Sequence, residues 1–437
     1  MVEVEGQSMR ARIIFRNRIE FRITAVLGAI AFATVLLMIL SPAAIAARRH
    51  PQSSAAHAAR KAVQEAASAI ALSDIHVLGD HPAPFALDAK AAMLIDAATG
   101  TEIYGYNEHL KMQPASLAKL MTFYLTLDAL SNKRLTLDTP ITISEQAWRL
   151  SMDQSVSRMF LGVGQQVPVH DLLFGLMVSS GNDAAVALAE YLAGSTAAFT
   201  EQMNAKAKQI GLVETHFTNP DGLPVEGEYT TAADMTKLAR SLLEHHPEAV
   251  TYTEAKEFTF DKIRQPNFNS LLFYDARVDG LKTGHVQEAG YHLVASANSH
   301  GMHLISAVMG TPSSEKRRTE TEKLIDWAFR SYVTAKPDWH GVVPATMPVF
   351  YGAADTVPIA PSSQSAVTVE RGQETKVTLQ WTPSAKYLDA PIPKGAHAGD
   401  VALIVDGKPE DSIPVVTQAA VARGGFFKRL TDHLRRK

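Results

Sequence analysis

Residues 114–122 read Pro-Ala-Ser-Leu-Ala-Lys-Leu-Met-Thr, and this stretch decides how the rest of the chain is interpreted. It places Ser116 and Lys119 three residues apart at the expected start of a helix, where both side chains share one face. The free N–H groups and the positive end of the helix dipole favour a developing anion at Ser116. The stretch therefore predicts a serine nucleophile that is activated by a neighbouring amine.

Two further motifs supply what this chemistry needs. A lysine acts as a base only when it is neutral, so the pKa of Lys119 must fall below its usual value of about 10.4. Burial and a second cation both lower such a pKa, and Lys282 in Lys282-Thr283-Gly284 is the expected second cation. Ser180 and Asn182, in a loop between two helices, are expected to complete a proton relay and to hold a substrate amide.

The Lys282-Thr283-Gly284 motif is expected on a strand, where an extended peptide can pair along the edge. Gly284 leaves room for the close approach of a backbone. The backbone N–H groups of Ser116 and His285 are the expected donors to an oxyanion. Substrate binding is therefore predicted for Lys282, Thr283, Gly284 and His285.

Each motif also has a simpler interpretation. A second Ser-x-x-Lys occurs at Ser313–Lys316, so the first motif alone is near chance in a chain of this length. A serine at a helix start is usually an N-cap, Ser-Gly-Asn can be a turn, and Lys282 can be a solvated strand residue. Only the first Ser-x-x-Lys follows a proline and precedes Ser-x-Asn and Lys-Thr-Gly in that order, and this combination favours catalysis.

Hydrophobic periodicity predicts an α+β domain over residues 84–335. Strands are expected near both ends of this segment and helices in its middle, which favours a mainly antiparallel sheet. The expected strands are 91–96, 102–104, 280–283, 291–297 and 303–308, and the expected helices are 117–130, 169–179, 183–193, 196–210, 231–245 and 314–332. Residues 336–418 alternate at period two between Pro, Gly and Ser turns, which predicts a small all-β domain that acts as a spacer or interaction module.

The N-terminus has the pattern of an export signal. Several arginines precede an apolar run over residues 23–40, and Ala44-Ile45-Ala46 supplies small residues at cleavage spacing. Residues 1–46 are therefore predicted to be a signal peptide, followed by an alanine-rich linker over 47–83. The apolar run is also long enough to span a bilayer, so an uncleaved anchor is the alternative. Both interpretations predict that the rest of the chain is exported.

The C-terminal segment, residues 419–437, is predicted to be an amphipathic tail. Phe426, Phe427, Leu430 and Leu434 fall within an arc of roughly 100° at helical spacing, and mostly basic residues occupy the other side. This pattern suits an interfacial helix on an anionic membrane. The alternative is a basic, disordered tail.

The composition excludes several function classes. A formal charge of −3 gives no reason to expect a nucleic-acid partner. The chain has no cysteine, so thiol nucleophiles, disulfides and thiolate metal sites are excluded. His300 and His303 lack a carboxylate partner, so we expect neither a metal nor another cofactor.

The three motifs together resemble those of penicillin-binding proteins and class A β-lactamases. The chain is specifically similar to the low-molecular-mass D-alanyl-D-alanine carboxypeptidases. The similarity runs from about residue 84 to the C-terminus and is carried by residues 114–122, 180–184, 278–285 and 289–297. It implies a transpeptidase-like α+β domain, with an antiparallel sheet and helices, followed by a small all-β domain.

The same resemblance implies roles for individual residues. Ser116 is expected to form the acyl-enzyme, Lys119 to accept its proton, and Lys282 to help bind the substrate carboxylate. Arg317 matches, by spacing, an arginine that the family often has near that carboxylate. The chain departs from the pattern at Phe268, where some members carry an arginine, and this leaves side-chain specificity open.

The expected function is therefore a penicillin-sensitive serine DD-carboxypeptidase that removes the terminal D-alanine from peptidoglycan stem pentapeptides. A DD-endopeptidase that cuts crosslinks, a β-lactamase and an inactive wall-binding scaffold are the alternatives. The expected partners are stem peptides, β-lactam inhibitors and the inner-membrane surface. The expected location is the periplasm, on the outer face of the inner membrane.

Overall fold

The computed structural model describes residue 72, residues 74–79 and residues 81–435. The predicted signal peptide, the apolar run over 23–40 and most of the predicted linker lie outside these residues. All the described residues belong to one unit, residues 71–437. Among them, no helix is both long enough and apolar enough to cross a membrane.

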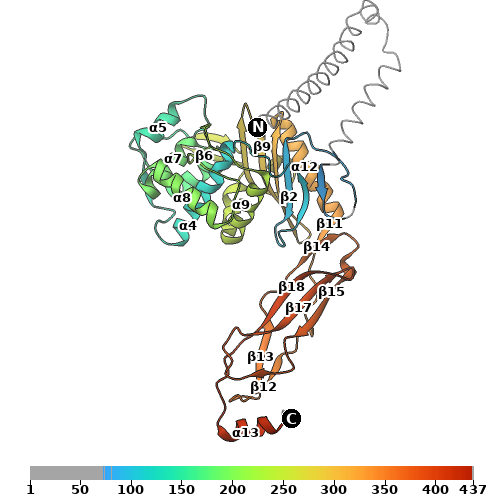
Figure 1. Cartoon of the computed structure of the whole chain (residues 1–437). Coiled ribbons are helices and arrows are strands. Elements are labelled where there is room, and N and C mark those ends of the chain that lie inside the picture. Colours follow the sequence, from blue (N-terminus) through green and yellow to red (C-terminus); the bar gives the residue numbers. More distant parts are fainter. Residues whose placement is uncertain (1–71, 73, 80, 436–437) are drawn as a thin grey trace, which may run out of the picture. The chain divides into compact units, whose positions relative to one another are not determined.

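A six-stranded antiparallel sheet forms the centre of the first domain (Figure 1). Its strand order is β1-β3-β2-β10-β9-β8, so strands from the two ends of the domain sequence pair with each other. The strands are β1 (Ile75–Val77), β2 (Ala91–Asp96), β3 (Glu102–Tyr106), β8 (Val278–Val286), β9 (Gly290–Ser299) and β10 (Met302–Thr311). This arrangement confirms the predicted α+β class, and it leaves β8, which carries Lys282-Thr283-Gly284, at one edge of the sheet.

Helices cover both faces of this sheet. On β10, Ala307 and Met309 join one hydrophobic cluster, whereas Val308 joins another on the opposite face, as the two-residue period of a strand requires. Helix α9 (Ala232–His245) packs on the first face and α12 (Ser314–Ser331) on the second. Because both faces are covered, β10 is apolar along most of its length.

The remaining helices of this domain form a lobe beside the sheet (Figure 1). Its elements are the 3-10 helix η2 (Ala115–Ala118), α4 (Lys119–Ser131), α5 (Glu145–Met152), α6 (Val169–Met177), α7 (Asn182–Ala193), α8 (Thr196–Gln209), η3 (Pro247–Ala249), α10 (Val250–Thr253) and α11 (Leu271–Tyr274). Two small hairpins complete it: β4 (Pro140–Thr142) with β5 (Gln166–Pro168), and β6 (Glu257–Phe260) with β7 (Ile263–Pro266). Helix α4 runs through the lobe with most of its side chains buried.

The rest of the chain forms an all-β domain, as predicted. Strand β11 (Tyr332–Ala335) pairs with β14 (Val367–Glu370), and a six-stranded sheet has the order β15-β17-β18-β13-β12-β16. Its strands are β12 (Thr346–Phe350), β13 (Thr356–Pro361), β15 (Val377–Pro383), β16 (Leu388–Asp389), β17 (His397–Val405) and β18 (Lys408–Thr417), with the 3-10 helix η4 (Glu374–Lys376) before β15. We call this part, β12 to β18, the β-domain.

A buried carboxylate links the two domains. Asp96, at the end of β2, accepts hydrogen bonds from the hydroxyl groups of Thr334 and Thr368 at 2.6 Å and 2.9 Å. Thr334 belongs to β11 and Thr368 to β14, so one side chain of the central sheet holds both strands of the connecting pair. Because Asp96 is fully buried, removing either threonine hydroxyl would cost its carboxylate a hydrogen bond that water could not replace.

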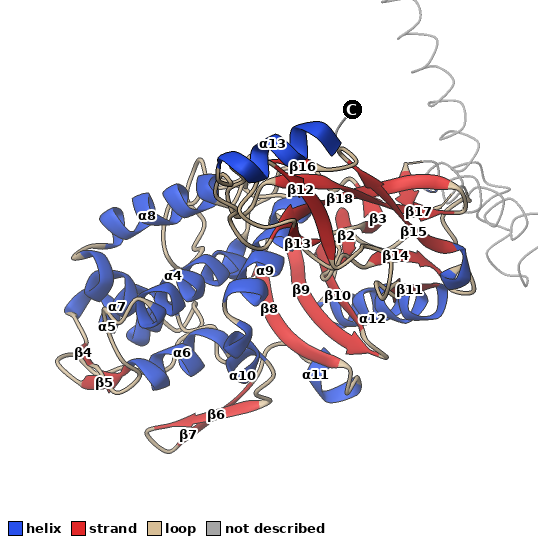
Figure 2. Ribbon diagram, turned by 90° about the horizontal axis from the view of Figure 1, so that it is seen from below, coloured by secondary structure: helices blue, strands red, loops and turns tan. Residues whose placement is uncertain are grey.

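The last element, α13 (Phe426–Arg435), lies against the β-domain beside β12 and β16 (Figure 2). It contacts this domain through its polar side. Asp432 is buried and accepts a hydrogen bond from the Tyr351 amide at 2.8 Å, and Lys428 forms ion pairs with Asp432 and Asp355. The apolar side chains of α13 are exposed, namely Phe426, Phe427, Leu430 and Leu434.

Candidate active site

The three motifs line one cavity of about 510 Å³. Its wall includes Ser116, Ser180, Asn182, Thr283, Gly284, His285 and Arg317. Lys119 and Lys282 are fully buried, and each contacts a serine of this wall. The fold therefore brings together all the residues that the sequence singled out, although they come from η2, α4, α7, β8, α12 and the loops between them.

Ser116 lies in a tight turn rather than at the start of an α-helix. The sequence predicted a helix start at Ser116, but the structure forms the 3-10 helix η2 there, and α4 begins at Lys119. The turn is entered through Ala115, whose φ of +50° lies in the left-handed region. The Ser116 side chain caps neither helix, so the N-cap interpretation is wrong, and its hydroxyl faces the cavity.

Two glycines let neighbouring chain segments approach this turn closely. A Cβ on Gly222 would lie 1.9 Å from the Ala115 carbonyl oxygen, and a Cβ on Gly284 would lie 3.0 Å from the Pro114 carbonyl oxygen. The absence of a side chain at Gly284 therefore serves the contact between β8 and the Ser116 turn. The same residue also lines the cavity.

The Lys119 side-chain nitrogen contacts three oxygen atoms. Its Nζ atom lies 3.0 Å from Ser116 Oγ, 2.6 Å from Asn182 Oδ1 and 2.5 Å from the carbonyl oxygen of Asp221. A neutral amine has two N–H donors and one lone pair. With the two donors on Asn182 and Asp221, the lone pair points to the Ser116 hydroxyl.

Burial makes the neutral form of Lys119 accessible. Loss of solvent lowers its pKa from 10.5 to about 8, against the opposing charges of Asp221, Asp183 and Glu228. Lys282 is affected in the same direction. Burial, followed by the charges of Lys119 and Arg317, lowers the pKa of Lys282 well below its usual value.

Lys282 connects the strand motif to Ser180. Its Nζ donates to Ser180 Oγ at 2.9 Å and to the Thr283 carbonyl oxygen at 3.1 Å. Ser180 has a positive φ of +55°, a conformation that is uncommon for a residue with a side chain. Ser180 and Ser116 line the same cavity, so two serine–lysine pairs face one space.

Arg317 forms the cationic end of the cavity. It is mostly buried in α12, its Nη2 donates to the Phe268 carbonyl oxygen at 3.0 Å, and its guanidinium lies 5.8 Å from the centre of the Tyr291 ring. Burial lowers its pKa to about 10, so it remains a cation at neutral pH. Phe268, where the sequence departs from the family pattern, also lines the cavity.

Several supporting residues were not predicted from the sequence. Asp183 is buried beside Asn182 and accepts hydrogen bonds from Ser151 Oγ and from the amides of Met159 and Leu161. It thereby holds the segment whose serines, Ser155 and Ser157, line the cavity. The Ser-x-Asn motif is followed directly by this aspartate, and that adjacency is the signal that could have identified it.

His292 is a second supporting residue. Its Nδ1 accepts from the Gly310 amide at 2.9 Å, which leaves Nε2–H to donate to the Gln113 carbonyl oxygen at 3.2 Å. Burial lowers its pKa to about 4, so it is neutral. It ties β9 and β10 to the chain just before Ser116. Within the described residues, no group of histidines and carboxylates could hold a metal ion.

The fold and the paired serines and lysines of this cavity define a class of active-site serine enzymes. Comparison with known protein families gives the same class. The family model described as D-alanyl-D-alanine carboxypeptidase matches residues 79–313, and that of the penicillin-binding protein 5 C-terminal domain matches residues 332–423.

Individual relatives extend over most of the chain. It is 39% identical to the D-alanyl-D-alanine carboxypeptidase DacC of Escherichia coli over 80% of this chain and 88% of the relative. It is 35% identical to DacA of the same species over 84% and 92%. Penicillin-binding protein 5 from Haemophilus influenzae superposes with a TM-score of 0.72 at 37% identity, covering 78% of this chain and 99% of that one.

The chain belongs to the D-alanyl-D-alanine carboxypeptidase family. It is a serine-type D-Ala-D-Ala carboxypeptidase that acts on peptidoglycan. Its penicillin-binding-protein fold, with an N-terminal catalytic domain and a C-terminal all-β domain, confirms the predicted architecture.

Proposed function

We propose that Ser116 is the acylated nucleophile of this carboxypeptidase and that Lys119 is its base. The observation that carries this proposal is the position of Lys119 Nζ, 3.0 Å from Ser116 Oγ with its other two contacts on acceptors. In the first step, neutral Lys119 takes the Ser116 proton while Oγ attacks the carbonyl carbon of the penultimate D-alanine. The amides of Ser116 and His285 stabilise the oxyanion.

The second half of the reaction reverses these proton movements. The peptide bond breaks when protonated Lys119 returns its proton to the leaving amine, with Ser180 as the proposed relay, and D-alanine departs. Water then attacks the acyl carbon and gives a proton to Lys119. The ester bond breaks, Lys119 passes that proton to Ser116 Oγ, and the shortened peptide leaves. Asn182 holds Lys119 through its side-chain oxygen, and its N–H groups remain for the substrate amide.

The terminal carboxylate is assigned to the cationic end of the cavity. Arg317 is a cation there, and Thr283 adds a hydroxyl donor on the same wall. Lys282 acts on this end of the cavity indirectly, through its hydrogen bond to Ser180. A free carboxylate gains charge-assisted hydrogen bonds at this end, and this preference supports a carboxypeptidase over an endopeptidase.

Two measurements test these assignments. Fluorescent penicillin should label the wild-type protein and should not label Ser116→Ala. Mass spectrometry should show conversion of stem pentapeptides to tetrapeptides by the purified enzyme. If crosslinked dimers are cut faster than pentapeptides are trimmed, the endopeptidase alternative replaces the carboxypeptidase.

A penicillin is expected to inhibit this enzyme rather than to be turned over rapidly. Class A β-lactamases use a carboxylate to activate the deacylating water. Between Trp148 and Val167 the only acid is Asp153, which is exposed and accepts hydrogen bonds from Ser155. The solved structure of penicillin-binding protein D2 from Listeria monocytogenes with ampicillin, 32% identical to this chain, supports β-lactam binding. Fast steady-state hydrolysis of a chromogenic cephalosporin would contradict this proposal.

We also propose that the exported protein binds the outer face of the inner membrane through α13. The helix contacts the β-domain with its charged side and exposes its apolar side, which suits insertion into a membrane interface. Beside it, a cavity of about 490 Å³ is lined by Arg423, Arg429 and His433. The guanidinium groups of Arg423 and Arg429 complement anionic lipid headgroups.

Deletion of residues 424–437 from protein that lacks the signal peptide tests this proposal. The truncated protein should no longer float with vesicles that contain anionic phospholipid, and its hydrolysis of pentapeptide should be unchanged. A double variant, Phe427→Ser with Leu434→Ser, should show the same loss without removing the helix. Continued flotation of the truncated protein at high salt would place the membrane contact elsewhere.

A further inference from the structure

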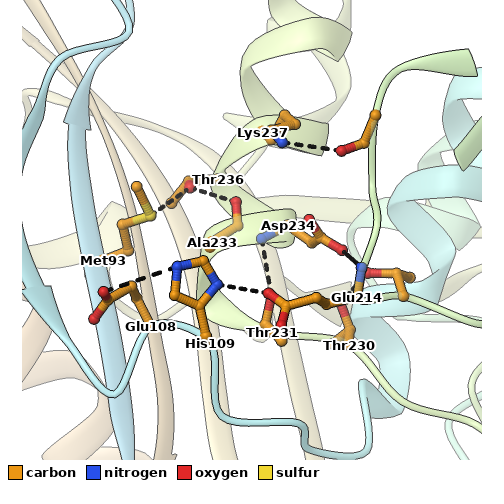
Figure 3. A network of polar contacts seen from close by, with 12 residues as sticks. Met93, Glu108, His109, Glu214, Thr230, Thr231, Ala233, Asp234, Thr236 and Lys237 are labelled. Carbon is orange, nitrogen blue, oxygen red and sulfur yellow. Dashed lines mark hydrogen bonds and ion pairs between the residues drawn. The ribbon is translucent and has the colours of Figure 1, made fainter. Parts of the chain in front are cut away.

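A loop between two fixed points passes over Lys119. At its ends, His216 pairs with Tyr229, and Thr230 pairs with Met112. Figure 3 shows how Asp234 stabilises the two ends of this loop. Its side chain accepts from the Glu214 amide at 2.8 Å, and its own amide donates to Thr231 Oγ1 at 3.1 Å. We call residues 217–228 the base loop.

The base loop is attached to both the nucleophile turn and α4. The Pro220 carbonyl oxygen accepts from Thr122 Oγ1 at 2.6 Å, and the Asp221 carbonyl oxygen accepts from Lys119 Nζ. Gly222 packs on the Ala115 carbonyl group. Further along, Leu223 and Pro224 line the catalytic cavity.

Glu228, the last residue of this loop, is a buried carboxyl group that the mechanism above does not use. Its side chain is 5% exposed. Neither carboxyl oxygen has a hydrogen-bond partner within the described part of the chain. Burial raises the pKa of Glu228 to about 8, against the opposing effect of the nearby Thr218 backbone.

The charged groups around Glu228 and Lys119 belong to several elements of the domain. Asp221, in the same loop, is also buried, and burial raises its pKa. Asp183 faces Lys119 from α7, and Lys282 is coupled to Lys119 from β8. Asp183 accepts several hydrogen bonds and is therefore satisfied. Glu228 is the member of this cluster whose carboxyl oxygens have no such partner within residues 81–435.

A purely structural role does not explain a glutamate at this position. A buried carboxyl without partners destabilises the folded state. Glutamine has the same shape and carries no charge that burial opposes. Groups that are unfavourable for stability are retained where a site needs them.

We propose that Glu228 is a positioning residue that controls, through the charge it presents to the base loop and Lys119, whether Lys119 holds a proton. When Glu228 is neutral, Lys119 loses its proton readily and serves as the base. When Glu228 is ionised, its negative charge favours the protonated, inactive form of Lys119. The inference rests on the proposed role of Lys119 as the base.

The direction of the effect follows from the coupling of the two groups. Because Lys119 and Glu228 both titrate near pH 8, the first proton released from the pair comes partly from each group. In Glu228→Gln only Lys119 can release it. The rise of activity with pH should therefore occur at lower pH in this variant than in the wild type.

The test is the pH dependence of acylation by fluorescent penicillin and of D-alanine release between pH 5 and 10. In Glu228→Gln the rising limb should move down by roughly half a pH unit or more, which is about a threefold rate increase on that limb. Glu226→Gln is the matched control, since Glu226 lies in the same loop but is exposed. Glu228→Asp keeps an ionisable group and should retain a limb nearer to that of the wild type.

Thermal unfolding gives a second, independent measurement. A folded-state pKa of about 8, above the ordinary value of 4.5, means that the wild type loses stability as pH rises from about 4.5 to 8. Glu228→Gln should not show this loss, so its advantage in Tm should grow over the same range. This result does not depend on Lys119 being the base.

Two outcomes separate the inference from the function on which it rests. If the rising limb of Glu228→Gln coincides with those of the wild type and Glu226→Gln, the proposed control of Lys119 is wrong. If Lys119→Ala retains wild-type acylation, the assignment of the base is wrong instead. A Tm advantage with no shift of the limb would reduce Glu228 to a strained structural residue and would also overturn the proposal.

Discussion

The chain contains the sequence Ser-x-x-Lys twice, and the two copies have opposite environments. Ser313 is the N-cap of α12, and its Oγ accepts from the Lys316 amide at 3.1 Å. The Lys316 ammonium group lies at the surface, paired with Asp88 and Glu320, and these carboxylates raise its pKa. In the first copy, Ser116 caps no helix and Lys119 is fully buried with a pKa of about 8.

The difference shows that the four-residue pattern determines only that a serine and a lysine lie close together. The pKa of the lysine and the direction of its side chain depend on residues distant in sequence. Asn182 and Asp221 direct Lys119 from positions 63 and 102 residues away, whereas Lys316 meets one of its partners within the same helix, at Glu320. Burial opposes the ammonium ion in one copy, and carboxylates stabilise it in the other.

The largest expected effect is on the two serines. Ser116→Ala should abolish acylation by fluorescent penicillin, because it removes the hydroxyl that lies 3.0 Å from Lys119 Nζ. Ser313→Ala is the matched control and should be labelled at the wild-type rate. Labelling of Ser116→Ala, with loss of label in Ser313→Ala, would reverse the comparison.

The second effect concerns the two lysines. Lys119→Arg should lower kcat/KM by roughly 10²-fold or more, since an arginine cannot be deprotonated to act as a base. Lys316→Arg should retain full activity. In the wild type, kcat/KM should rise with pH through about 8, because only the neutral lysine accepts the serine proton. A flat profile between pH 6 and 9 would argue against Lys119.

A smaller effect is expected for two adjacent arginines of α12. Arg317→Ala should raise KM for a free-carboxylate peptide by roughly 10-fold or more, with less change in kcat, because a hydrogen bond to a charged group is lost. Arg318 pairs with Glu322 and lies over the Tyr274 ring, so Arg318→Ala should leave KM unchanged. Equal kinetics for the two variants would make Arg317 a structural residue.

The smallest effect is on stability. Loss of the α12 cap in Ser313→Ala should lower the free energy of unfolding by about 1 kcal/mol, measured by urea denaturation with activity retained. A cap at Ser116 would predict a similar loss for Ser116→Ala. Ser116 caps no helix, so Ser116→Ala should lose no stability through capping. Ser313→Ala should therefore be the less stable variant, and Ser116→Ala the one that is not acylated.

The sequence was sufficient for the main elements of the fold. The sequence pattern located β9, β10 and α12 within a few residues, because both strands are long and largely buried and α12 is a long helix with one buried face. The order of the motifs was enough to gather Ser116, Lys119 and Lys282 into one group. The first inference depends on local patterns, and the second depends on the sequence order of short motifs.

The remaining features depend on contacts between distant segments. The 3-10 turn at Ser116 requires the left-handed Ala115 and the packing of Gly222 and Gly284 on either side. The short hairpin of β6 and β7 has too few residues for a periodic signal. Glu228 reads as one more polar residue of a loop, and only its burial distinguishes it from Glu226.

The contact between Lys119 and residue 221 has a consequence for mutational tolerance. Lys119 is directed there by a main-chain carbonyl group, which no side-chain replacement can remove. The neighbouring Gly222 has a φ of +76° and no space for a Cβ beside Ala115. If residues 221 and 222 are each replaced by every other amino acid, the orientation of Lys119 should be lost mainly through substitutions at 222, one position after the contact itself. A substitution that redirects Lys119 through this contact would have to move the backbone.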